Sequence, residues 1–94
     1  MIRYVKTPDE VLDYGWDWSR LLPDGVTLAG VVHTVPTGLT LDAESYDDDG
    51  TTVWLSGGTA SERYLVTAKA TDSGGRIYTR TFEIVCRDYR SGDA

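Results

Sequence analysis

The sequence predicts an all-β fold, an antiparallel sandwich of two layers with about seven strands. Three observations support this prediction. Apolar and polar residues alternate with a period of two in most of the apolar segments. Turn-forming Gly, Pro and Asp residues separate these segments at spacings of about 8–12 residues, which is typical of antiparallel sandwiches. No segment of the 94-residue chain requires a helix.

The first two expected strands differ in character. Residues 2–6 alternate between apolar and polar side chains until Pro8, which cannot pair in a ladder, so this segment is either an edge strand or an extended arm. In residues 12–19 an aromatic face that includes Trp16 and Trp18 alternates with a polar face. A helix would scatter these side chains around its circumference, so the alternation predicts a strand.

The other expected strands follow one another between turn signals. They comprise residues 26–35, 39–46, 51–56, 63–71 and 76–87. In the third of these, Trp54 is out of phase with Val53 and Leu55, so either the tryptophan or that pair points outward.

The length, the net charge and the apolar segments of the chain limit the class of protein that it can be. The net charge is −6 at pH 7, whereas non-specific binding to nucleic acid or to an anionic membrane needs a basic face. No apolar run approaches the ~20 residues of a membrane span, and no signal-peptide core is present. We therefore expect one domain, residues 1–94, that is made and used without crossing a membrane and has no nucleic-acid or membrane partner. Residues 1–8 are the candidate N-terminal arm, and residues 88–94 are expected to form a flexible tail.

Nothing in the sequence indicates a reaction, a cofactor or a metal site. His33 and Cys86, the only residues of their kinds, fall in apolar strands, so we interpret the first as an ordinary strand histidine and the second as a buried small hydrophobe. Residues 47–49 are consecutive aspartates without the spacing of a calcium loop. Asp13 and Asp17 lie opposite an aromatic face, where they would be solvated. We expect no enzyme activity, no cofactor and no metal.

Tyr64 indicates the type of sandwich. It begins a late strand after a glycine corner, in GTASERYLVTAKATD, where its hydroxyl would hydrogen-bond to the upstream backbone. Such a tyrosine corner is typical of immunoglobulin-like sandwiches. With a single cysteine, the chain lacks the inter-sheet disulfide of antibody domains. We therefore expect an immunoglobulin-like scaffold whose function lies on loops, edges and termini.

Several motifs carry a resemblance to known families. ERYLVTAKATDSGGR resembles the penultimate-strand hairpin of PKD-type and bacterial immunoglobulin-like domains. Over about residues 6–86, KTPDEVLDYGWDWSRLL, HTVPTGLTL and TTVWLSGGTASERYLVTAKATDSGGRIYTRTFEIVC resemble small tailed-phage proteins described as fiber-tail adaptor or immunoglobulin-like virion proteins. That group shares the patterns D-Y-x-x-D-W, T-V-P-x-G-L and V-W-L-S-G-G-T. The resemblance implies a structural virion protein, present in many copies, without enzymatic activity or a cofactor.

We therefore expect a virion protein that acts by docking onto other virion proteins, as an adaptor or connector at the tail, the fiber or the head-tail neck. It would be assembled in the host cytoplasm and could form a homo-oligomer. Two alternatives stay open, a capsid decoration protein on the phage head and a carbohydrate-binding module that uses the tryptophans. The candidate interface residues are Trp54, Trp16, Trp18, Ile2, Tyr4 and Val5. The competing interpretation places all three tryptophans in the core.

Overall fold

The computed structural model describes residues 2–87, and this part of the chain contains seven strands and no helix. The strands are β1 (Arg3–Lys6), β2 (Leu12–Asp17), β3 (Leu28–Thr34), β4 (Leu39–Tyr46), β5 (Gly50–Gly57), β6 (Arg63–Asp72) and β7 (Ile77–Cys86). The all-β prediction is confirmed, and every expected strand is present. Within residues 2–87 there is accordingly no helix that could span a membrane. The predicted flexible tail, residues 88–94, lies outside the described residues.

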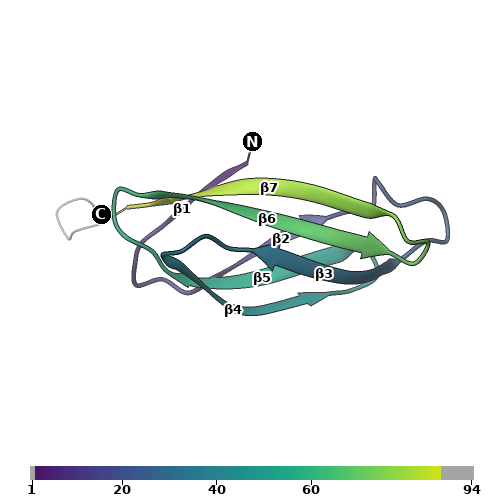
Figure 1. Cartoon of the computed structure of the whole chain (residues 1–94), viewed down its shortest axis with the longest axis horizontal. Helices are drawn as coiled ribbons and strands as arrows, with labels where there is room; N and C mark the ends of the chain where they lie inside the picture. The colour runs from purple at the N-terminus through teal and green to yellow at the C-terminus, as the bar shows by residue number, and fades with distance from the viewer. Residues whose placement is uncertain (1, 88–94) are drawn as a thin grey trace.

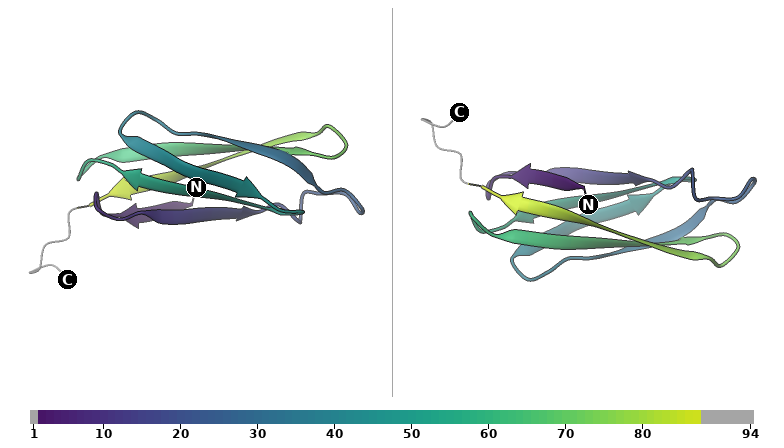
Figure 2. Two further views of the ribbon diagram at one scale, coloured as in Figure 1. Left: turned by 90° about the horizontal axis from the view of Figure 1, so that it is seen from below. Right: turned by 90° about the horizontal axis from the view of Figure 1, so that it is seen from above.

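The strands form two sheets that face each other (Figures 1 and 2). One sheet has the order β1-β7-β6-β3 and the other the order β2-β5-β4. All neighbouring strands are antiparallel except β1 and β7, which run parallel. Strands β2, β5 and β4 match the B-E-D sheet of an immunoglobulin fold, and β3, β6 and β7 match its C-F-G sheet. The first strand joins the free edge of β7.

The core lies between the inward faces of the two sheets. Strand β6 shows the alternation most clearly, because Tyr64, Val66, Ala68 and Ala70 are all buried and the residues between them are not. A larger cluster contains Tyr64, Val66 and aromatic and aliphatic side chains of β2, β5 and β7. A smaller cluster places Trp18 with the two alanines. Small residues opposite a large indole let this end of the sandwich fill its volume.

A tyrosine corner closes the other end of the core. The backbone N–H of Thr59 donates a hydrogen bond to the Tyr64 hydroxyl at 2.8 Å, as the sequence predicts. Gly38 has a φ of 109°, and a Cβ built there would come within 2.8 Å of Cε1 of Tyr64. The N–H of Gly58 donates to the carbonyl of Gly38 at 2.9 Å. The T-V-P-x-G-L and V-W-L-S-G-G-T motifs therefore meet at this corner, which explains their glycines structurally.

Strand β1 is an edge strand in this structure, not a detached arm. It pairs with β7 in the register Arg3 to Glu83 through Lys6 to Cys86. The side chain of Lys6 is fully buried, and its Nζ donates to the carbonyl of Gly57 at 2.5 Å and to that of Thr7 at 2.8 Å. Because Gly57 belongs to β5 in the opposite sheet, Lys6 ties the two sheets together.

Candidate docking surfaces

Trp54 is the tryptophan that faces solvent. It lies on β5, the middle strand of the β2-β5-β4 sheet, and remains 43% exposed. Its neighbours Val53 and Leu55 are fully buried, which settles the phase that the sequence leaves open. Asp13 on β2 and Ala43 on β4 are its cross-strand partners. Tryptophan is enriched among the residues that dominate protein interfaces, so this position is a candidate anchor.

Trp16 and Trp18 belong to the core packing of the same sheet. Trp18 is only 1% exposed, and its Nε1 donates a hydrogen bond to Oγ1 of Thr51 at 2.9 Å. Trp16 is half-buried and packs against Trp18 and Phe82, with ring centroids 6.1 Å and 6.3 Å away. Neither indole is presented to a partner in this conformation. Both support the sheet that presents Trp54.

The N-terminal candidates divide in the same way. Ile2 and Val5 are exposed along the β1 edge. Tyr4 is half-buried and packs on Tyr14 and Phe82, with ring centroids 4.9 Å and 5.6 Å away. Ile2 and Val5 are therefore accessible apolar positions on one sheet, whereas Trp54 lies on the other.

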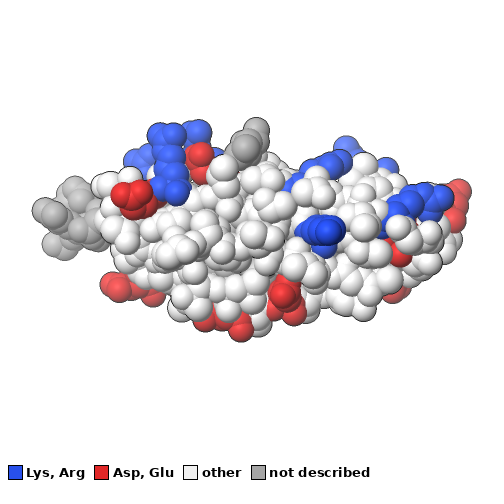
Figure 3. Space-filling view, in the orientation of Figure 1, with Lys and Arg blue, Asp and Glu red and all other residues white. Residues whose placement is uncertain are grey.

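Charge is divided between the two sheets. The charged residues on the strands of the β2-β5-β4 sheet are all acidic, and the β4–β5 turn adds three aspartates; they are Asp13, Asp17, Asp42, Glu44, Asp47, Asp48 and Asp49. The strands of the other sheet carry four exposed basic residues, Arg3, Arg63, Lys69 and Arg80. Their two acidic residues are less accessible, because Asp72 is buried and Glu83 is ion-paired with Arg3 at 2.6 Å. In Figure 3 basic side chains lie over β6 and β7, with some acidic ones among them at both ends of the molecule, and further acidic side chains line the lower edge.

Sequence reasoning missed this segregation, although its signal is present in the chain. The segments that become β2, β4 and β5 contain no lysine or arginine. The pattern becomes visible only when these three segments are assigned to one sheet, because they are not consecutive along the chain.

The burial of Lys6 was also missed, since lysine is rarely buried and nothing local indicates its acceptors.

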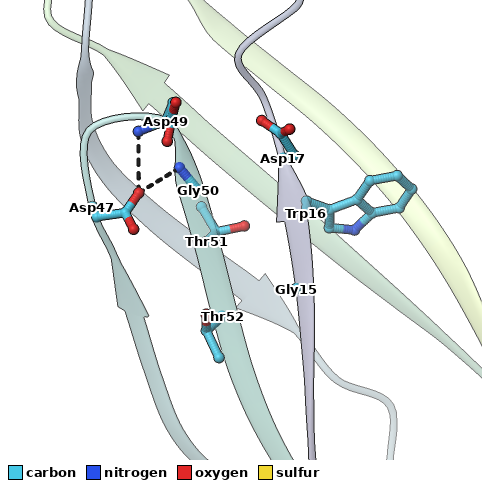
Figure 4. A pocket seen from close by; sticks show the side chains of 8 residues that line it. All are labelled: Gly15, Trp16, Asp17, Asp47, Asp49, Gly50, Thr51 and Thr52. Atoms are coloured by element: carbon cyan, nitrogen blue, oxygen red, sulfur yellow. Dashed lines mark hydrogen bonds between the residues drawn. The ribbon is translucent and has the colours of Figure 1, made fainter.

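A hollow of about 440 Å³ lies where β2 meets the β4–β5 turn (Figure 4). Asp17, Asp47 and Asp49 line it, and the Trp16 indole is turned away from these carboxylates. Oδ1 of Asp47 accepts hydrogen bonds from the N–H groups of Asp49 at 3.1 Å and Gly50 at 2.7 Å. Its carboxylate thus shapes the turn. Within residues 2–87 no group of three or more His, Cys, Asp or Glu side chains is arranged to hold a metal ion.

The contacts of His33 and the burial of Cys86 indicate structural roles for both residues. Nδ1 of His33 lies 2.9 Å from Oε1 of Glu44, and this oxygen also accepts the backbone N–H of His33 at 3.0 Å. Because β3 is an edge strand, Glu44 occupies a donor that could otherwise pair with another chain. Cys86 is fully buried, as predicted, and burial raises the pKa of its thiol. A thiol of this kind is a poor nucleophile.

The fold and these surfaces define a small immunoglobulin-like scaffold whose accessible chemistry lies on its outer faces and edges. A family model described as "Podophage GP4 fiber-tail adaptor protein gp77" matches residues 6–85, and the chain belongs to this family. The family is one of structural phage adaptor proteins, so the chain is a structural component of a phage virion. Neither capsid decoration nor carbohydrate binding gains support from this match. No curated protein matches the chain significantly.

Proposed function

We propose that this protein joins a tail fiber to the tail of a phage particle by protein–protein docking, without catalysis. The match of residues 6–85 to the fiber-tail adaptor family carries the proposal. The proposed neighbours are other virion proteins, which bind it during assembly in the host cytoplasm. No contact with nucleic acid or membrane is required for this role.

The sandwich supports this role because its accessible apolar residues lie on different sheets. Trp54 belongs to the β2-β5-β4 sheet. Val5 lies in β1, at the edge of the other sheet, and Ile2 directly precedes that strand. Two neighbours could therefore contact these positions at the same time. An adaptor needs this property, since it must hold one structure while it is held by another.

The packing beneath these positions makes the scaffold rigid. Trp16 and Trp18 fill the core under the sheet that carries Trp54, and Tyr4 anchors β1 on Tyr14 and Phe82. Rigid presentation reduces the entropy that a docking contact must overcome. We therefore assign the direct contacts to Trp54, Ile2 and Val5, and a supporting role to Trp16, Trp18 and Tyr4.

A nonsense mutation in the gene, in the phage that encodes the chain, tests this proposal. We expect particles with filled heads and tails that lack fibers, and a large loss of adsorption to the host. Wild-type protein supplied in trans should restore the fibers. Particles with normal fibers and fragile heads would instead indicate capsid decoration, and quenching of tryptophan fluorescence by oligosaccharides would indicate sugar binding. Either result would overturn the proposal.

A further inference from the structure

The outer face of the β2-β5-β4 sheet combines negative charge with one exposed indole. Trp54 lies in the middle strand, with Asp13 beside it on β2. On its other side, Ala43 is its partner and Asp42 lies at the bulge in β4. Both aspartates are exposed. The complement of such a face is a surface that offers cations together with apolar contact area, because cations pair with carboxylates and also favour the faces of indole rings.

The outer face of the other sheet has these properties. Lys69 on β6 lies between Val32 on β3 and Thr79 on β7. Val32 is 60% exposed. Leu65, which lies four residues before Lys69 on the same face of β6, is 53% exposed. Arg63 adds a further exposed cation at the start of the same strand. The one carboxylate beside Leu65, Glu83, is largely buried and ion-paired with Arg3 at 2.6 Å, so the unpaired charges of this face are basic. One chain thus carries both halves of a complementary pair of faces.

We propose that the Trp54 face docks on the Lys69 face of a second copy of this chain. This inference rests on the proposed function for the role of Trp54 as an anchor. It assigns the neighbour at Trp54 to a second copy of the chain, which leaves the β1 edge with Ile2 and Val5 for the other virion proteins. Because the two faces differ, the contact is heterologous and repeats from copy to copy, as a closed ring or an open row. A row or ring of adaptors would present several attachment points around a tail.

The available area and charge allow this contact. A specific interface takes about 800 Å² from each partner, which is about one seventh of the 5796 Å² that the chain exposes. The Trp54 face has three strands and the Lys69 face has four, so β1 with Ile2 and Val5 can remain uncovered. The net charge of −6 repels copies at a distance, but at physiological salt this repulsion is screened beyond about 8 Å. Contacts between the aligned faces act at shorter range.

Sedimentation velocity of the purified protein, in a concentration series, tests the inference. We expect the average mass to rise with concentration and the association to weaken in high salt. Trp54→Ala should weaken association by at least about 30-fold if the indole is a dominant anchor. Leu21→Ala is the matched control, because Leu21 is exposed but lies in the β2–β3 connection, outside both faces. It should leave association unchanged.

Charge reversal tests the pairing of the two faces. The double variant Asp13→Lys, Asp42→Lys and the double variant Arg63→Glu, Lys69→Glu should each lose association alone. A mixture of the two should associate again, because the altered faces become complementary to each other. The milder pair Asp13→Asn, Asp42→Asn serves if the lysine variant does not fold, as judged by circular dichroism.

A wild-type protein that stays monomeric at every concentration would overturn this inference. So would association that neither Trp54→Ala nor the charge variants weaken, since another surface would then be responsible. These results are separate from the nonsense-mutant experiment. Fiberless particles together with a monomeric protein would retain the adaptor role and reject the contact between copies.

Discussion

At the scale of single residues, two buried tyrosines differ in what their hydroxyls do. Tyr64 is 7% exposed and its hydroxyl accepts a hydrogen bond from Thr59 N–H. Tyr14 is 6% exposed, and its buried hydroxyl has no hydrogen-bond partner. The two form a matched pair for substitution, since both rings pack in the same core cluster.

We expect Tyr64→Phe to lower the free energy of unfolding by about 1–2 kcal/mol, because it leaves the Thr59 N–H without its acceptor. Tyr14→Phe should be neutral or stabilising, since it removes a buried polar group without a partner. Urea denaturation of both variants beside the wild type measures the difference. Equal losses in the two variants would show that the corner hydrogen bond contributes nothing specific.

Tyr14 also makes stability depend on alkaline pH. Burial raises the pKa of its phenol from 10.0 to about 12. Above pH 10 the unfolded chain therefore ionises this group before the folded chain does. The part of the folding stability that depends on a neutral phenol at Tyr14 is fully present below pH 10 and is lost as the pH rises through 12. Urea midpoints across this range should fall less steeply in Tyr14→Phe than in the wild type. Parallel curves would show that Tyr14 does not cause the dependence.

At the scale of elements, strand β1 depends on one buried lysine. The Nζ of Lys6 donates to two backbone carbonyls, one of them in the opposite sheet. Lys6→Met should therefore lower stability by about 1–3 kcal/mol and loosen β1. Hydrogen exchange should then accelerate in residues 2–6. Arg20→Met is the control and should change neither quantity, because Arg20 is an exposed cation in the β2–β3 connection, outside both docking faces. Equal exchange in both variants would contradict the tie between the sheets.

The sequence predicts the seven strands. It leaves open which way some side chains point and how residues 2–6 pair, and both gaps have a physical cause. Alternation puts Trp16 and Trp18 on one aromatic face of β2 without deciding whether that face is core or interface, and it leaves the direction of Trp54 open because either phase of β5 is consistent. The choice between edge strand and arm for residues 2–6 depends on pairing with β7, about 80 positions along the chain. No local pattern carries information on a partner that distant.

At the scale of the whole molecule, the division of charge between the sheets is the property with most consequence for function. Composition predicts an acidic protein, and only the strand order reveals that one sheet lacks exposed basic residues on its strands. Of the six candidate interface residues, the structure leaves Trp54, Ile2 and Val5 exposed. Sequence reasoning could not separate these from Trp16, Trp18 and Tyr4, since aromatic residues serve cores and interfaces equally well.

A cryo-electron-microscopy reconstruction of intact particles, from the phage that encodes this chain, tests the central claim most directly. The account predicts density for the seven-stranded sandwich at the junction of fiber and tail, in contact with both, with Trp54 buried in a contact. Density for the sandwich on the head, or its absence from assembled particles, would contradict the adaptor role.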